Sequence, residues 1–341
     1  MMTMTFTAPR LTVLLPVYNA APYLGEAVRS VLGQSFVDFE LLAIDDGSTD
    51  ESLDILRSFD DPRMRVERND ANLGLIATLN KGLDLARGEY VARMDGDDVA
   101  MPRRFEAQVA LLDGDARLGA CGMFIETFGF GRSKVLRYPV RNEQVQCHLL
   151  GYTPMAHPTV MFRKPMFDHH GLRYDRNFPH AEDYDLLERA SHCFRLANIP
   201  EVGLRYRLHA TQVSRVHSDI LQESVSRIRS RRMKRFLQDE CSECVPSMLD
   251  IFFNTGRHVT SDEISAVRNW IDMVLDRNRC TRIFNDAELS EFLEARWINV
   301  CNRVSKKGMR LWNLYSSFPS RTHGTRFMFD RFKLFVKCVL K

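Results

Sequence analysis

No stretch of this sequence approaches the roughly 20 consecutive apolar residues that a membrane-spanning helix needs. Its first residues also lack the charged segment followed by a long apolar segment that marks a secretory signal. The eight cysteines are scattered without the spacing of a disulfide framework, which is typical of reduced thiols in the cytosol. A net charge of +3 is too small to indicate nucleic-acid binding by itself. We therefore expect a soluble, cytoplasmic chain that at most lies on the inner face of the cytoplasmic membrane.

The rest of the composition is that of an ordinary globular protein, with 45% hydrophobic and 27% charged residues. The first half of the chain alternates short apolar runs with amphipathic segments. Strands are expected at 11–18, 39–45, 64–70 and 89–98, and helices at 21–35, 51–59 and 72–88, the last closed by Gly88. This alternation predicts a parallel α/β sheet covered by helices on both faces.

Polar motifs follow three of the expected strands. Tyr18 and Asn19 follow the first, Asp45 and Asp46 end the second, and the stretch 95–98 ends the fourth with three aspartates. Because ligands bind beyond the carboxyl ends of parallel strands, these motifs should meet in one crevice. Carboxylates this close repel each other unless a cation offsets their charge. A magnesium-type site is the favoured interpretation, and a solvated acidic turn is the alternative.

Five segments occur in the order seen in family 2 of the inverting, nucleotide-sugar-dependent glycosyltransferases: VLLPVYNAAPYLGEAVRSVLGQSF, LLAIDDGSTDES, NLGLIATLNKGLDLARGEYVARMDGDD, AHPTVMFRK and AEDYDLL. The sequence resembles this family over about residues 10–215. The resemblance implies a GT-A fold, a Rossmann-like mixed sheet flanked by helices. We expect it to form a catalytic domain at 1–215, followed by a helical, basic region at 216–341.

The resemblance also implies a donor site. Its nucleotide pocket would be formed by Pro16, Tyr18, Asp46, Asn72, Gly74 and Asp95. Asp46 would accept a hydrogen bond from the base, because an ionised carboxylate would repel a diphosphate. Asp97, with Asp95, would bind Mn²⁺ or Mg²⁺, which would stabilise the charge of the departing nucleoside diphosphate. This reasoning favours a UDP-sugar, although dTDP- and GDP-sugars remain open.

An acidic pair, Glu182 and Asp183, begins an amphipathic helix. The helix N-terminus should help to keep both carboxylates ionised. The resemblance implies that Asp183 is the catalytic base and that Glu182 orients the acceptor or supports the base. The alternative is that the pair only caps the helix.

Histidines give a weaker signal. His209 matches a family position near the diphosphate, where a neutral imidazole could bind the metal. We expect Arg205 and Arg207 on the opposite face of the strand from His209. For His157, a contact with the acceptor and a purely structural role are equally compatible with the sequence.

After about residue 215 the strand pattern stops, and helices are expected at 225–237, 261–278 and 288–305. The basic segments 225–237 and 327–341 fit either contact with an anionic membrane surface or a solvated face; membrane contact is slightly favoured only for 327–341. Cys241 and Cys244 have no second pair at zinc-site spacing and are interpreted as incidental thiols.

These observations together predict a glycosyltransferase that acts on a glycan or lipid-linked acceptor in surface polysaccharide synthesis. A Q-x-x-R-W string is absent from the sequence, which favours addition of one or a few sugars over polymerisation. A nucleotidyltransferase is an alternative, but the segment PVYNAAPYLGEA is not the Gly-rich basic loop that it would need. Asp97 and Asp183 argue against a non-catalytic nucleotide-sugar-binding protein, and only 225–237 would favour a nucleic-acid-binding module. We expect no nucleic-acid partner.

Overall fold

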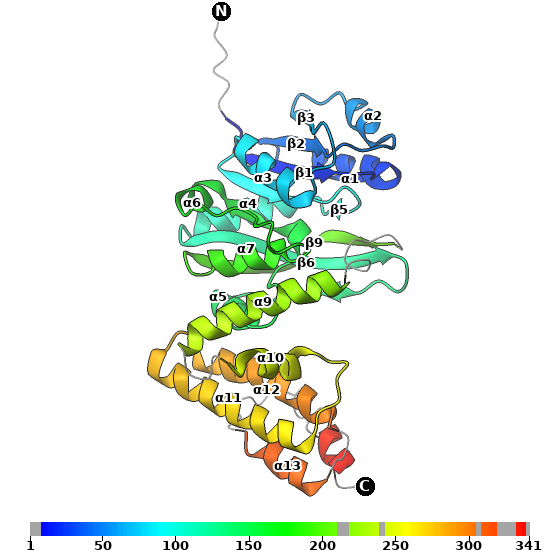
Figure 1. The fold of residues 1–341 in the computed structure, drawn as a ribbon. Helices are drawn as coiled ribbons and strands as arrows, with labels where there is room; N and C mark the ends of the chain where they lie inside the picture. The colour runs from blue at the N-terminus through cyan, green and yellow to red at the C-terminus, as the bar shows by residue number, and fades with distance from the viewer. Residues whose placement is uncertain (1–7, 210–217, 239–242, 305–307, 319–331, 339–341) are drawn as a thin grey trace, which may run out of the picture. The chain divides into compact units, whose positions relative to one another are not determined.

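The computed structural model describes residues 8–209, 218–238, 243–304, 308–318 and 332–338 (Figure 1). Contacts divide the chain into two compact units, one of residues 1–145 and 153–224 and the other of residues 146–152 and 225–341. The expected boundary between residues 215 and 216 lies outside the described residues. The inclusion of 146–152 in the second unit had no signal in the sequence.

The first unit contains a mixed sheet whose described part has nine strands. Their order is β3-β2-β1-β4-β8-β6-β9-β5, with β7 paired to β6. The bounds are β1 Leu11–Val17, β2 Phe39–Asp45, β3 Met64–Arg68, β4 Tyr90–Arg93, β5 Val99–Ala100, β6 Leu118–Gly129, β7 Val135–Leu136, β8 Met161–Arg163 and β9 Arg195–Leu208. The first four strands pair in parallel, as expected, whereas β8 is antiparallel to both β4 and β6.

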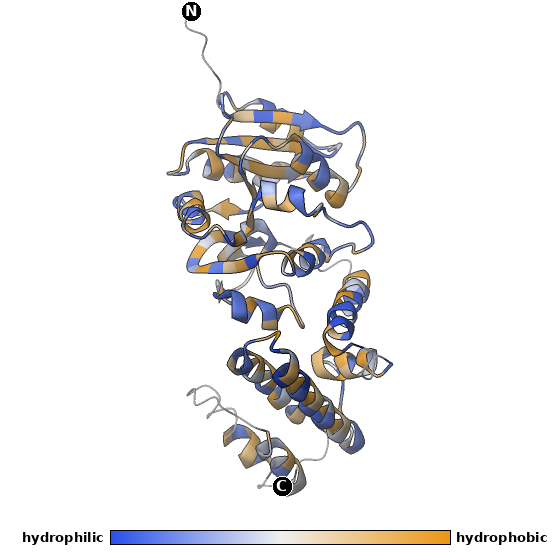
Figure 2. Ribbon diagram, turned by 90° about the vertical axis from the view of Figure 1, so that its left-hand side faces the viewer, coloured by the Kyte–Doolittle hydropathy of each residue, from blue (hydrophilic) through white to orange (hydrophobic). Residues whose placement is uncertain are grey.

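Helices flank this sheet and complete its core. They are α1 Ala21–Leu32, α2 Ser52–Arg57, α3 Leu75–Leu85, α4 Arg104–Gly114, α5 Asn142–His148, η1 His157–Thr159, α6 Lys164–His169 and α7 Glu182–Ala190. Leu24, Val28 and Val31 of α1 are fully buried, because their helical spacing places them on one face. Figure 2 shows apolar residues concentrated in the central strands and alternating with polar ones along the helices.

Gly88 does not cap a helix, which corrects the expectation from the sequence. Helix α3 is capped at Ala86, and Gly88 lies beyond it in the buried approach to β4. A Cβ on Gly88 would collide with backbone atoms of Leu11, Thr12 and Tyr90. The residue is glycine because the chain there runs against β1 with no room for a side chain.

The second unit is helical in its described part. Its helices are α9 Ser218–Leu237, of which the first unit holds the beginning, α10 Val245–Phe253, α11 Ser261–Thr281, α12 Asp286–Asn302 and α13 Met309–Ser316. Trp297, Phe252 and Trp270 are buried in its core. Helix α11 starts at a capping box in which the side chains of Thr260 and Glu263 bind each other's backbone N–H.

The basic segment 225–237 lies on α9, and two of its arginines have structural contacts. Arg229 donates to the carbonyl of Gly151 at 2.8 Å and lies over the ring of Phe253. Arg232 is buried and donates to the backbone and side-chain oxygens of Gln146 at 3.0 and 2.8 Å. These two arginines therefore stabilise the second unit.

Within the described residues, no helix combines the length and the apolar composition that crossing a membrane requires. Of the basic segment 327–341, residues 332–338 are described, and they are helical. Cys241 lies outside the described residues.

Candidate active site

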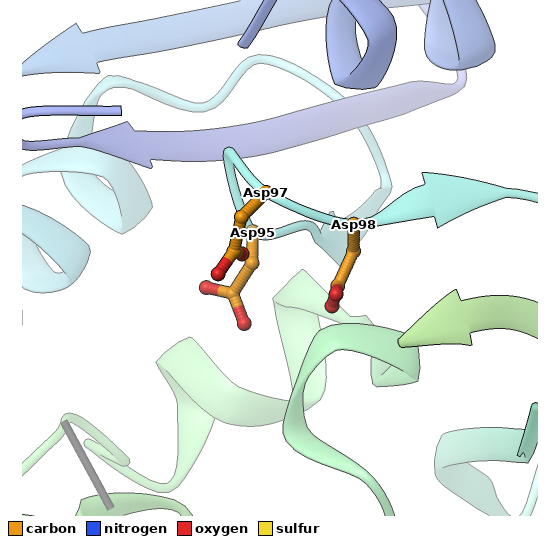
Figure 3. Close-up of side chains that lie close together, drawn as sticks. All are labelled: Asp95, Asp97 and Asp98. Atoms are coloured by element: carbon orange, nitrogen blue, oxygen red, sulfur yellow. The ribbon is translucent and has the colours of Figure 1, made fainter. Parts of the chain in front are cut away.

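The acidic cluster lies in the turn between β4 and β5. Strand β4 ends at Arg93, earlier than expected, so the aspartates follow the strand instead of continuing it. Carboxylate oxygens of Asp95, Asp97 and Asp98 lie within 4.8 Å of one another. Figure 3 shows the Asp95 and Asp97 side chains next to each other and that of Asp98 farther along the turn. The turn thus presents two adjacent carboxylates to the same space.

Arg93 supplies a positive charge to this acidic cluster. This residue was not predicted from the sequence. Its guanidinium is buried and binds the carboxylate of Asp95. Burial disfavours the charge of Arg93, yet the attraction of Asp95 leaves the arginine pKa above its usual value. Burial also raises the pKa of Asp95, with a contribution from Asp97, although Arg93 opposes this rise. A charged residue at the end of a buried strand was the available signal.

Two residues at the end of β9 reach the same turn. Arg207 donates its backbone N–H to Asp98 at 2.9 Å and its Nε–H to the carbonyl of Asp97 at 2.8 Å. The Nε2 atom of His209 lies 2.9 Å from Oδ2 of Asp97. The expectation that Arg207 points away from His209 is wrong, because residues two apart along a strand direction share a face.

Arg205 also shares that face, since both it and Arg207 place their guanidinium groups over the ring of Phe128 at 4.3 and 4.4 Å. Asp98 is buried, and its pKa lies well above the usual range because of burial and the charges of Asp95 and Asp97. Asp98 therefore holds β9 to the turn, while Asp95 and Asp97 face the same space and His209 contacts Asp97.

Asp46 organises the loop that carries Asn72 and Gly74. Its carboxylate is only 4% exposed and accepts three hydrogen bonds. One oxygen accepts from Asn69 at 2.7 Å and from the backbone N–H of Leu73 at 2.9 Å, and the other accepts from the backbone N–H of Gly74 at 2.9 Å. The structure thus brings Asp46 next to Asn72 and Gly74, as the sequence implied, and its contact with a base stays a prediction.

The neighbouring turns close against this loop. Gly47 has a φ of +71°, and a Cβ there would collide with the backbone of Ala71 and Asn72. Pro16 lies in β1, and Tyr18, just after that strand, is 49% exposed. An exposed aromatic ring beside two buried strand ends is a surface that a planar base could contact.

The acidic pair lies in the first turn of α7. The hydroxyl of Thr153 donates to Oδ2 of Asp183 at 3.2 Å. Burial raises the pKa of Asp183, although backbone N–H groups and Thr153 oppose the rise. Burial and the neighbouring charge of Asp183 raise the pKa of Glu182 to about 7. Burial therefore opposes the helix N-terminus, which was expected to help keep both carboxylates ionised, and for Glu182 burial outweighs it.

His157 lies beside the acidic pair. Its Nε2 atom is 2.9 Å from the hydroxyl of Tyr174, and its Nδ1 atom is 3.8 Å from Oε1 of Glu182. Burial and the charge of Arg93 hold the pKa of His157 well below its usual value, so the imidazole is neutral. The charge of Arg93 also acts on Glu182 and Asp183, lowering their pKa values. The charge of one buried guanidinium thus acts on both the acidic turn and the acidic pair.

Comparisons with known proteins identify relatives of this chain. Residues 12–171 match the family model described as Glycosyl transferase family 2. An uncharacterized glycosyltransferase of Haemophilus influenzae is 31% identical over 241 residues, which cover 67% of this chain and 75% of that protein. The succinoglycan biosynthesis protein ExoO of Rhizobium meliloti is 30% identical over 223 residues, which cover 61% of this chain and 63% of that protein.

A solved structure extends the likeness to the fold. TarS 1–349 of S. aureus, in complex with UDP-GlcNAc, has a TM-score of 0.54 and 17% identity. The match covers 85% of this chain and 89% of that one. At this level of identity the likeness establishes the fold, a curled mixed sheet flanked by helices of the GT-A type.

Proposed function

This chain belongs to glycosyl transferase family 2, and we propose that it moves a sugar from a UDP-linked donor to a hydroxyl of a glycan or lipid-linked saccharide. The transfer would be a single displacement with inversion at the anomeric carbon, assisted by a divalent metal. Its likeness to a succinoglycan biosynthesis protein supports a role in surface polysaccharide, lipopolysaccharide or exopolysaccharide synthesis. We place the reaction in the cytoplasm, at the inner face of the membrane.

The observation that carries this proposal is the pairing of two acidic groups around Arg93. One is the acidic turn, and the other is the acidic pair at the start of α7. Inverting transfer needs two such functions, one to offset the charge of the leaving diphosphate and one to accept the acceptor's proton. The guanidinium of Arg93 lets both anionic groups share a buried region without full mutual repulsion.

The residues of the turn fit a metal ion. Asp95 and Asp97 provide hard carboxylate oxygens, and the imidazole of His209 suits Mn²⁺ better than Mg²⁺. When bound, the ion would act as a Lewis acid toward the leaving diphosphate. Arg93 binds one carboxylate oxygen of Asp95, which fixes the orientation of that side chain. Arg207 holds the backbone of Asp97 in place.

The nucleotide would lie over the turns after β1 and β2. A carboxylate offers about four acceptor positions, and Asp46 uses three of them within the protein. The remaining position is compatible with a hydrogen bond from the N–H of a uracil-type base. Pro16, Tyr18, Asn72 and Gly74 would line the same pocket, with Asn72 and Gly74 held by the Asp46 loop.

Asp183 would accept the proton of the acceptor hydroxyl as the hydroxyl oxygen attacks the anomeric carbon. Its raised pKa makes it a stronger base than an exposed aspartate, while the bond from Thr153 fixes one of its oxygens. Glu182, whose pKa is about 7, would hold or orient the acceptor beside the neutral imidazole of His157. The leaving nucleoside diphosphate departs from the opposite side of the sugar, which gives inversion.

Calorimetric titration with UDP, dTDP, GDP and CDP, each with and without Mn²⁺, tests these roles. We expect metal-dependent binding of UDP by the wild type and by Asp183→Asn, and its loss in Asp97→Ala. Asp183→Asn should keep binding but lose turnover by roughly 10²–10⁴-fold. Absence of binding by every nucleotide in the presence of Mn²⁺ would refute the proposed function. If Asp183→Asn binds nucleotide and its turnover is unchanged, another residue must be the catalytic base.

A further inference from the structure

An exposed hairpin follows the long strand β6. Residues 129–137, with the sequence GFGRSKVLR, are all exposed and include the short strand β7. Phe130 is 75% exposed, the largest value for any large apolar side chain in the described chain, and Val135 and Leu136 are 39% and 42% exposed. Val135 and Leu136 are successive residues of β7 and therefore lie on opposite faces of the hairpin, so Phe130 is the apolar side chain that the hairpin presents most fully.

The same hairpin carries positive charge. Arg132, Lys134 and Arg137 are exposed, and the segment contains no acidic residue. The acidic residue at its base, Glu126, accepts a hydrogen bond from Ser133 at 3.0 Å and lies 3.9 Å from Arg205. The hairpin therefore combines apolar side chains and cationic groups, the combination that favours an anionic lipid surface.

The base of the hairpin is connected to the candidate active site through β9. The backbone N–H of Phe130 donates to the carbonyl of Leu208 at 3.1 Å, and Phe128 pairs with Arg207 across the strands. Arg207 in turn binds the backbone of Asp97 in the acidic turn. Figure 1 shows β6 and β9 running side by side toward this end of the sheet. A surface bound by the hairpin would lie near the residues that we assign to the reaction.

We propose that the 129–137 hairpin docks this protein on anionic phospholipid membranes. Phe130 enters the interfacial layer, and the three basic side chains contact lipid headgroups. The choice of a bilayer fits the lipid-linked acceptor and so rests on the proposed function, but docking does not require catalysis. It also locates membrane contact in the first unit, whereas the sequence slightly favoured such contact only for 327–341.

Flotation of the full chain with lipid vesicles tests the proposal. Vesicles of phosphatidylcholine alone are compared with vesicles of equal parts phosphatidylcholine and phosphatidylglycerol. We expect salt-sensitive binding to the anionic vesicles only. Replacing Arg132, Lys134 and Arg137 by Gln should lower the partition coefficient roughly a hundredfold. Phe130→Ser should lower it about tenfold.

Matched controls separate the hairpin from general surface effects. Replacing the exposed Arg57, Arg87 and Arg176 by Gln removes the same charge elsewhere, and Val37→Ser removes a side chain that is 68% exposed outside the hairpin. These variants should bind vesicles as the wild type does. Equal losses in control and hairpin variants, or no binding by the wild type, would overturn the proposal.

Two further measurements complete the test. Light scattering that shows a dimer for the wild type and a monomer for Phe130→Ser would assign the hairpin to self-association instead. UDP titration on the same samples separates the two proposals. Hairpin variants should keep UDP binding, and a wild type that binds vesicles but no nucleotide would refute the proposed function alone.

Discussion

The hydrogen bond from Thr153 to Asp183 offers a sensitive test of the base assignment. The hydroxyl oxygen of Thr153 lies 3.2 Å from Oδ2 of Asp183 and 3.3 Å from the carbonyl oxygen of Met155. Thr153→Val keeps the shape of the side chain and removes the donor. A donor to a carboxylate favours the charged form, so its loss should raise the pKa of Asp183 further above the usual range.

The size of the effect follows from the geometry. A hydrogen bond to a charged group contributes about 1.5–3 kcal/mol, but the single hydroxyl proton of Thr153 is shared between two acceptors. We therefore expect Thr153→Val to remove about 1 kcal/mol of the free energy that stabilises the charged form of Asp183. This loss corresponds to an increase of about 0.7 in the pKa of Asp183. Because a base acts only when deprotonated, the acid limb of kcat/KM should move to higher pH by this amount.

The assay is the pH dependence of kcat/KM for sugar transfer. At pH values below the acid limb, kcat/KM of Thr153→Val should be about fivefold lower than that of the wild type. On the plateau at higher pH, the two values should be equal. Thr153→Ser retains the hydroxyl and should restore the wild-type limb. Because Glu182 and Asp183 titrate as a coupled pair, the apparent pKa of the acid limb belongs to the pair and not to one residue. The quantity to compare is therefore the difference in this apparent pKa between Thr153→Val and the wild type. A uniform loss at every pH, with the limb unmoved, would refute the reasoning and assign Thr153 to packing.

Three other perturbations have defined outcomes. Glu182→Gln removes the carboxyl whose pKa is about 7 and leaves the ionisation of Asp183, which occurs while Glu182 is still protonated, unchanged; the pH profile of kcat/KM should therefore lose any inflection near pH 7 and keep the acid limb at lower pH, whereas a displaced acid limb would refute the order of ionisation. In urea unfolding, Gly88→Ala should lower the free energy of unfolding by about 3 kcal/mol. Gly114→Ala should not lower it, because a Cβ at Gly114 would enter open space; equal free energies of unfolding for the two variants would exclude the predicted collision. Arg232→Met should destabilise the second unit by about 2 kcal/mol, because its acceptors lose their donor, while the exposed Arg235→Met should be neutral in the same assay.

Strands with buried faces were predictable because their signal is local. The run at 39–45 is apolar along most of its length and became β2 with the same bounds, and the run at 11–18 became β1 with one residue less. Strands β5, β7 and β8 have two or three residues each, so they carry no periodic pattern. The positions of β5 and β8 depend on pairing with strands that are distant in sequence, β9 for β5 and β4 and β6 for β8, whereas β7 forms a hairpin with the preceding strand β6.

Parts of the candidate site were predictable for a similar reason. The aspartates of the acidic turn and the pair Glu182 and Asp183 lie beside strand and helix ends that the sequence marks. Arg93 and Thr153 were not predicted from the sequence, and Arg207 was expected on the wrong face. Thr153 acts through a contact with Asp183 thirty positions away, for which one sequence offers no local signal.

The sequence by itself determined which groups exist and where each lies along its own strand or helix, because side-chain identity and periodicity are local properties. That was sufficient for the family, the sheet and both acidic motifs. Only the tertiary structure decided that His209 meets Asp97, that the charge of Arg93 acts on both acidic groups, and that burial and the charge of Asp183 raise the pKa of Glu182 to about 7. Proximity and burial are produced by residues far apart in the chain, and they control the electrostatic free energy of each charge.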